Sequence, residues 1–172
     1  NATPLLSTGY FAGTFGYWLQ TGAGTPYQNF IDKVDATGGI SELVLYIGSE
    51  SDGWMEETTK AAMISGYKTL FGRLQTDCGS GVKFLLSPLS RNGNAYPASD
   101  DATWTACILA AIEAPGENPG MYVGAMNTDV ELSGDYTHWT AAGYTLNAQR
   151  MAQSALYAMG EETYHRGPEI LG

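Results

Sequence analysis

The sequence predicts an α/β domain with a parallel sheet, because strand-like and helix-like segments alternate along most of the chain. Three short apolar runs, over residues 43–47, 82–86 and 121–125, predict strands. Each run is followed by a longer segment in which apolar residues recur at helical spacing. Crossover helices between successive strands make those strands parallel, so one parallel sheet is expected.

The first strand run, Leu-Val-Leu-Tyr-Ile at 43–47, contains no charged residue and is followed by Gly48. A continuous apolar run of this kind is typical of a parallel strand that helices cover on both faces. A short helix is expected before it over 27–34, where three apolar residues share one face. Residues 1–30 otherwise predict loops or a short strand, with a turn-rich loop at 21–26.

A long helix is predicted over 54–75, with Ser51 or Asp52 as its N-cap. The side chains of Ser and Asp accept hydrogen bonds from the first amides of a helix, which have no partner inside it. The strand over 82–86 follows this helix and leads into a long turn at 87–94. The apolar stripe of the helix is Ile64, Tyr67, Phe71 and Leu74.

Two more helices are predicted in the second half of the chain. The first starts after Asp100 or Asp101, and Pro115-Gly116 is expected to end it, since proline lacks the amide that a continuing helix needs. Its stripe is Trp104, Cys107, Ile108, Ala111 and Ile112. The last helix is predicted over 140–159, with the stripe Tyr144, Ala148, Met151, Ala155 and Met159.

The composition indicates one packed domain and disfavours several kinds of partner. The chain has 172 residues, of which 44% are hydrophobic and 12% aromatic, enough for a sizeable core. Eighteen acidic against eight basic residues give a net charge of −10, which disfavours nucleic acid and anionic membranes and otherwise favours solubility. No apolar run approaches the roughly 20 residues of a membrane span.

The chain begins without Met and without a signal peptide. We therefore expect residues 1–172 to form a single domain that is the C-terminal portion of a longer or processed polypeptide. Residues 160–172 predict a polar tail, in which His165 is expected to be solvated and inert.

Two cysteines, Cys78 and Cys107, can form one disulfide or remain as two buried thiols, and their spacing does not decide between these states. The place of Cys107 on a helical apolar stripe favours a core thiol. No cluster of Cys and His has the spacing of metal ligands, so neither a metal nor another cofactor is predicted.

The segment Asp135-Tyr-Thr-His138 is the strongest candidate for chemistry, and it stands just before the last predicted helix. Residues three apart face the same side of a tight turn or of a first helical turn. The Asp135 carboxylate can then accept the Nδ1 proton of the imidazole and leave Nε2 free as a general base, as in a hydrolytic triad. The spacing by itself is also typical of an ordinary capped turn.

Glu50 follows the first predicted strand, and its loop can serve as a helix N-cap region or as part of a site. In parallel sheets, ligands bind beyond the carboxyl ends of the strands. Because Glu50 and His138 both come just after such ends, one site can contain both.

These features resemble the SGNH (GDSL-type) hydrolases, and within them the carbohydrate O-acetylesterase branch with its sialate and acetylxylan esterases. The Asp-Tyr-Thr-His motif at 135–138, with the following residues 139–144, resembles the final block of that family. The sequence Gly-Ser-Glu-Ser-Asp at 48–52 resembles the third block, where this branch has Gln-Gly-Glu-Ser-Asp. Gly22 or Gly24 falls where the glycine of the second block is expected.

The resemblance implies a three-layer α/β/α sandwich with a parallel, flavodoxin-like sheet. It also implies that a serine esterase of this kind removes acetyl groups from a sugar. His138 would be the general base and Asp135 would fix its tautomer. The residues implied to bind the oxyanion or to orient the substrate are Gly22, Gly24, Glu50 and Ser51.

The family's first block, a strand that ends in Gly-Asp-Ser or Gly-Gln-Ser and carries the nucleophile, is absent from the sequence. Ser7 is the only serine ahead of Gly22, but it follows no clear strand and lies too close to that glycine. We therefore expect the nucleophilic serine on an upstream segment or a companion chain. Without that strand, a neighbouring strand would present an unpaired edge.

A second hypothesis is a non-catalytic carbohydrate-binding or structural module that keeps the esterase fold, for instance in a viral tail or a surface adhesin. The absent serine and the presence of Glu50 both fit this hypothesis. A further alternative, a lipase or thioesterase of the same superfamily, would need an apolar groove for the acyl chain. Trp139, next to His138, can line a cleft and stack on a sugar ring, whereas Trp104 is expected in the core. An extracellular or secreted protein is expected in either case.

Overall fold

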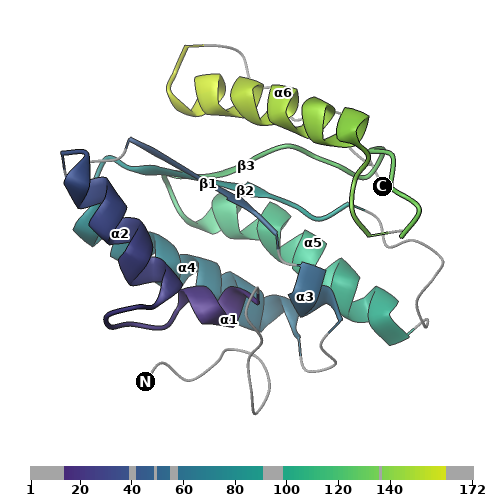
Figure 1. Cartoon of the computed structure of the whole chain (residues 1–172), viewed down its shortest axis with the longest axis horizontal. Coiled ribbons are helices and arrows are strands. Elements are labelled where there is room, and N and C mark those ends of the chain that lie inside the picture. Colours follow the sequence, from purple (N-terminus) through teal and green to yellow (C-terminus); the bar gives the residue numbers. More distant parts are fainter. Residues whose placement is uncertain are drawn as a thin grey trace.

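A three-stranded parallel sheet forms the middle layer of the molecule (Figure 1). The strands are β1 (Leu43–Ile47), β2 (Lys83–Ser87) and β3 (Met121–Val123), paired in the order β1-β2-β3. The predicted strands and their parallel pairing are confirmed. This computed structural model describes residues 14–38, 42–48, 50–54, 58–90, 99–135 and 137–161, and within them every side chain except those of 99–101.

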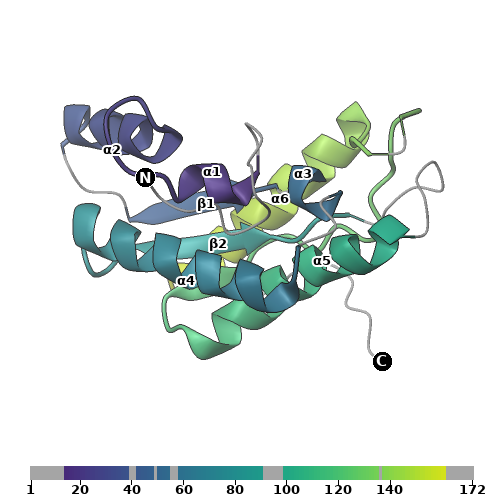
Figure 2. The same cartoon turned by 90° about the horizontal axis from the view of Figure 1, so that it is seen from below.

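Helices lie on both faces of the sheet, as Figure 1 shows. One face carries α6 (Ala141–Ala158). The other carries α1 (Phe15–Trp18), α2 (Pro26–Ala36), α4 (Lys60–Asp77) and α5 (Ser99–Glu117). The short helix α3 (Glu50–Gly53) follows the carboxyl end of β1 (Figure 2). The fold is therefore the expected three-layer α/β/α sandwich with a parallel sheet.

The larger core lies between the sheet and the helices α1, α2, α4 and α5. Phe84 of β2 is fully buried, and its ring stacks on Phe71 of α4 with centroids 6.2 Å apart. Phe15 of α1 packs edge to face on Tyr46 of β1 at 5.3 Å and on Tyr67 of α4 at 4.6 Å. These aromatic contacts fix α1 and α4 against two strands.

Among the described helices, α2, α4 and α6 each begin after a threonine whose side chain accepts a hydrogen bond from an amide of the first turn, namely Thr25, Thr59 and Thr140. The prediction that Ser51 or Asp52 caps the long helix is wrong, because Thr59 caps it and residues 50–53 form α3 instead. Asp52 is buried and has another partner, since its Oδ2 accepts the Phe15 amide at 2.8 Å.

Helix α5 continues through Pro115 to Glu117, so the prediction that Pro115-Gly116 ends it is wrong. Proline removes one amide donor from the helix, and here the loss is confined to the final turn. Asn118 completes this end, because its side-chain Nδ2 donates to the Ala114 carbonyl at 2.6 Å.

The buried face of α6 differs from the predicted apolar stripe, since Tyr144 and Met159 are exposed. Asn147 lies on the buried face because it finds partners at the strand ends, where its Nδ2 donates to Ser87 Oγ at 3.2 Å and to Asn127 Oδ1 at 3.0 Å. The buried residues of the helix are Gly143, Asn147, Arg150, Met151, Ser154 and Ala158.

β1 is one of the two edge strands of the described sheet, and the prediction that helices cover both its faces is wrong. Leu45 and Ile47 are 48% and 51% exposed on the face that carries α6. Helix α6 packs on β2 and β3, and within the described ranges no helix covers this part of β1. An apolar run predicts a strand correctly, but it does not show which partner covers the strand.

Cys78 and Cys107 are both free and buried, in agreement with the interpretation of a core thiol. Burial is the main cause that raises the pKa of each thiol above its ordinary value. Because the thiolate is the reactive form, both cysteines are expected to be inert towards oxidants and metals.

We expect Phe84→Ala to lower the free energy of unfolding by about 3–5 kcal/mol, because it removes a fully buried ring and leaves a cavity. The control is Leu109→Ala at an exposed position of α5, where a change within about 0.5 kcal/mol is expected. Denaturant unfolding of both variants measures the difference. Equal losses would contradict this placement of the core.

Candidate active site

Within the segment that connects β3 to α6, residues 131–140 form a short hairpin, which we call the His138 hairpin; residue 136 lies outside the described residues. Its arms are joined by a bridge between Leu132 and Trp139 and by the backbone hydrogen bonds Ser133 N to His138 O at 2.7 Å and Thr140 N to Glu131 O at 3.1 Å. The first arm follows the carboxyl end of β3, and the second leads directly into α6. The hairpin therefore carries Asp135 and His138 at its tip.

Asp135 and His138 form the pair that their spacing suggests. The Nδ1–H of His138 donates to Asp135 Oδ2 at 2.6 Å. The other oxygen, Oδ1, accepts the amides of Thr137 and His138 at 3.0 Å each, together with the Ser133 hydroxyl. These contacts hold the carboxylate in one orientation, and the side chains of His138 and Asp135 remain 61% and 52% exposed. Nε2 of the ring is then the unprotonated nitrogen.

The hydrogen bonds in this turn shift both pKa values. The Ser133 hydroxyl, His138 and two backbone amides lower the pKa of Asp135 well below its ordinary value. The hydrogen bond to Asp135 is the main cause that raises the pKa of His138. Burial opposes it as the next largest effect, and the charges of Asp135 and Glu50 add smaller increases. The imidazole is consequently a stronger base than a free histidine, for which the pKa is about 6.5.

Glu50 lies in α3, and the contacts of that helix hold it at the end of β1. The buried Asp52 accepts the Phe15 amide through Oδ2, and its own carbonyl accepts the Thr58 hydroxyl at 2.6 Å. The Thr103 hydroxyl of α5 donates to the carbonyl of Gly53. Sequence reasoning missed this role of Asp52, because a helix cap accounts equally well for an acidic residue after a strand.

Glu50 and His138 stand at the same edge of the sheet. Both follow carboxyl ends of parallel strands, and Figure 1 shows α3 and the segment before α6 at the same end of the molecule. The charge of Glu50 acts on the imidazole of His138, although the two residues are far apart in the sequence. Ser51 lies next to Glu50 in α3 and is half-buried.

Gly22 and Gly24 lie elsewhere. They belong to the exposed loop between α1 and α2, both with positive φ angles of 107° and 81°. The neighbouring Thr21 lines a shallow hollow together with Thr76 and other residues from the C-terminal half of α4. That half lies towards the amino ends of the strands, so the structure does not bring the two glycines beside Glu50 and His138.

The aromatic residues near the hairpin differ in exposure. Trp139 is buried, and its ring packs against Tyr144 at a centroid distance of 5.2 Å. Tyr144, which sequence reasoning assigned to the core, is therefore the more exposed aromatic surface next to the hairpin. Trp104 is buried as expected, and its Nε1–H donates to the Ser90 carbonyl at 2.7 Å.

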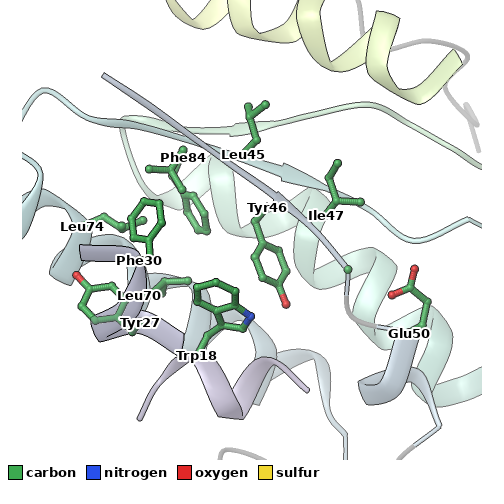
Figure 3. Close-up of a pocket in the computed structure, with 12 residues that line it drawn as sticks. Trp18, Tyr27, Phe30, Leu45, Tyr46, Ile47, Glu50, Leu70, Leu74 and Phe84 are labelled. Carbon is green, nitrogen blue, oxygen red and sulfur yellow. The ribbon is translucent and has the colours of Figure 1, made fainter. Parts of the chain in front are cut away.

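A hollow of about 240 Å³ runs along the edge of β1 that pairs with no other described strand, and we call it the β1 edge groove (Figure 3). Successive side chains of a strand point to opposite faces. Because five consecutive residues, 44–48, line the hollow, it follows the edge of the strand rather than one face. Trp18, Tyr27 and Phe30 from α1 and α2 form the facing wall, and Glu50 lies at the carboxyl end.

Several solved structures resemble this chain in fold. One of them is a carbohydrate esterase family 3 protein from Talaromyces cellulolyticus, with a TM-score of 0.55 and 14% sequence identity. The match covers 78% of this chain and 66% of the esterase, so this chain spans about two thirds of the length of that protein. No protein-family model matches the sequence, and no curated protein matches it. At this identity the likeness shows the fold alone.

Two kinds of feature are not found within the described ranges. No group of three or more His, Cys, Asp and Glu side chains is arranged to hold a metal ion. No helix there is both long enough and apolar enough to cross a bilayer. Ser7, which the sequence offers as an upstream serine, lies outside the described residues.

We expect the imidazole of His138 to titrate above the ordinary value of about 6.5, and Asp135→Asn to lower its midpoint. The substitution removes the charge and the acceptor that stabilise the imidazolium. NMR titration of the histidine ring protons measures the midpoint. An unchanged His138 midpoint in Asp135→Asn would contradict the pairing.

Proposed function

We propose that this chain supplies the acid–base part of a carbohydrate O-acetylesterase, in which a serine from a companion segment is the nucleophile. The observation that carries the proposal is the Asp135–His138 pair. A hydrogen bond of 2.6 Å between Nδ1 of His138 and Oδ2 of Asp135 orients the imidazole, which is exposed at the carboxyl edge of the sheet. The likeness in fold to a carbohydrate esterase supports the substrate class. Acetylated polysaccharides occur outside cells, so the proposal includes secretion.

In the proposed reaction, Nε2 of His138 takes the proton of the serine hydroxyl as its oxygen attacks the acetyl carbonyl carbon. The tetrahedral intermediate collapses when its bond to the sugar oxygen breaks, and the imidazolium returns the proton to that oxygen. Water then attacks the acetyl-serine with His138 again as base. Acetate leaves and the serine recovers its proton, while Asp135 keeps the ring in one tautomer throughout.

Glu50 is proposed to assist by charge. A carboxylate cannot donate a hydrogen bond to an oxyanion, but it stabilises the imidazolium that forms in each step. Ser51 is proposed to orient the substrate beside it. Amides at the end of the companion strand are the proposed oxyanion donors, because Gly22 and Gly24 belong to the exposed loop between α1 and α2.

The companion segment is proposed to lie in the β1 edge groove as a further parallel strand. The edge of a strand offers main-chain groups that only another extended segment can pair with along its length. The exposed Leu45 and Ile47 would pack beneath that segment or its following helix. A strand parallel to β1 would end near Glu50, which is where a nucleophile could approach His138.

We expect the assembly that contains both segments to hydrolyse p-nitrophenyl acetate and acetylated xylan. His138→Ala should lower kcat by about 10³-fold or more, since the general base is lost. His165→Ala is the matched control and should retain the parent rate. A parent rate that does not depend on His138 would overturn the esterase.

A non-catalytic carbohydrate-binding module is the second candidate, and one observation favours it. The exposed ring of Tyr144, which packs on Trp139 beside the hairpin, offers an aromatic surface on which a sugar ring can stack. If the assembly binds oligosaccharides but shows no turnover that depends on His138, the binding module replaces the esterase.

We expect the 172-residue chain to self-associate through β1, because this edge carries no charge that would prevent strand pairing. Leu45→Lys should reduce that association, as an exposed lysine on an edge strand disfavours pairing. Leu109→Lys, at another exposed leucine on α5, is the control and should leave it unchanged. Sedimentation over a range of concentrations measures the effect, and equal behaviour of the two variants would contradict an open edge.

A further inference from the structure

Arg150 of α6 binds the loop between β3 and the His138 hairpin. Its two terminal nitrogens donate to the two carboxylate oxygens of Asp129 at 2.7 and 2.8 Å, and Nη1 also donates to the Met126 carbonyl at 2.7 Å. The side chain of Arg150 is only 11% exposed, whereas that of Asp129 is 44% exposed, so the ion pair lies at the boundary between the core and water. A guanidinium bound through two parallel hydrogen bonds fixes the direction of its partner as well as the distance.

The loop before this ion pair is anchored separately. Asn127 Nδ2 donates to Ser87 Oγ at 2.9 Å and to the Pro88 carbonyl at 3.2 Å, and Asn147 Nδ2 donates to Asn127 Oδ1. These buried contacts hold the chain near the ends of β2 and β3. Beyond Asn127, Asp129 ties this loop to α6 through Arg150.

The second arm of the hairpin is fixed by the start of α6. A Cβ atom at Gly143 would lie 2.6 Å from Val130 Cγ1 and 2.9 Å from Trp139 Cβ, so only glycine allows this close approach. The first turn of α6 therefore touches residues before and within the hairpin. Arg150, two turns further along the same helix, holds the same loop at a second point.

We propose that Arg150 and Asp129 are positioning residues, which set the direction of the His138 hairpin and thereby the distance between the His138 imidazole and Glu50. The Asp135–His138 pair is local to the hairpin and does not need them. The placement of that pair relative to Glu50 does depend on Arg150 and Asp129, because Glu50 follows the end of a different strand. The catalytic meaning of this placement rests on the proposed esterase, although the placement itself does not.

A double-mutant cycle on the His138 midpoint tests the proposal without any substrate. In the parent chain, Glu50→Gln should lower the NMR midpoint of His138. In Asp129→Asn and in Arg150→Lys, most of that lowering should disappear, because the hairpin no longer holds the imidazole near Glu50. Lysine keeps the charge of Arg150 but not its paired donors, so it tests the geometry with the least effect on folding.

The double-mutant cycle distinguishes a change in the position of the His138 hairpin from a direct change in the electric field at His138. Removing the Asp129 carboxylate changes the field at His138 directly, but that change is the same whether or not Glu50→Gln is also present, so it cancels. Lys68→Met, in the exposed Lys68–Glu117 pair between α4 and α5, is the matched control and should leave the Glu50→Gln effect intact. Thermal unfolding identifies any variant that fails to fold. If Asp129→Asn fails to fold, the result for Arg150→Lys decides whether the proposal holds.

An undiminished Glu50→Gln effect in Arg150→Lys would overturn the proposal, and so would the lack of any such effect in the parent chain. Failure of the esterase is a different result, because turnover that does not depend on His138 leaves the coupling between Glu50 and His138 unchanged.

Discussion

The parallel pairing of three strands is the constraint on which the candidate site depends. Ile47 pairs with Ser87, and Leu86 with Val123, so the strands end at nearly the same level. Segments that leave these ends emerge at one edge of the sheet. Neither α3 nor the His138 hairpin could bring Glu50 near an imidazole by local structure alone, because each belongs to a different strand end.

The site combines one short-range and several long-range interactions. Asp135 and His138 are three residues apart, so the hydrogen bond between them needs only the turn that contains both. The position of that turn depends on buried polar contacts between α6 and the strand ends, among which Asn147 and Arg150 are central. On the opposite side, Asp52 ties the Glu50 segment to α1. Asn147 and Arg150 find acceptors for these buried donors within the fold, as buried polar groups require.

The sequence was sufficient for features that depend on local pattern. The strands, the parallel sheet and most helices follow from apolar periodicity, and the pairing of Asp135 with His138 follows from their spacing. It was insufficient where distant segments decide the outcome. Asp52 has the sequence properties of a helix cap, yet its partner is the amide of Phe15. The buried stripe of α6 is displaced because its polar partners lie at the strand ends, and the apolar run of β1 does not reveal that α6 packs on the other two strands.

The hydrogen bonds around Asp135 have a further consequence for how activity would be lost under stress. All of these partners lie within residues 133–138, so this small ring of contacts does not depend on the remote parts of the chain. Mild denaturation that loosens the packing between α6 and the sheet would leave the imidazole chemically competent but displaced. In the proposed esterase, loss of activity would then begin as a misalignment of an intact base, before the secondary structure melts.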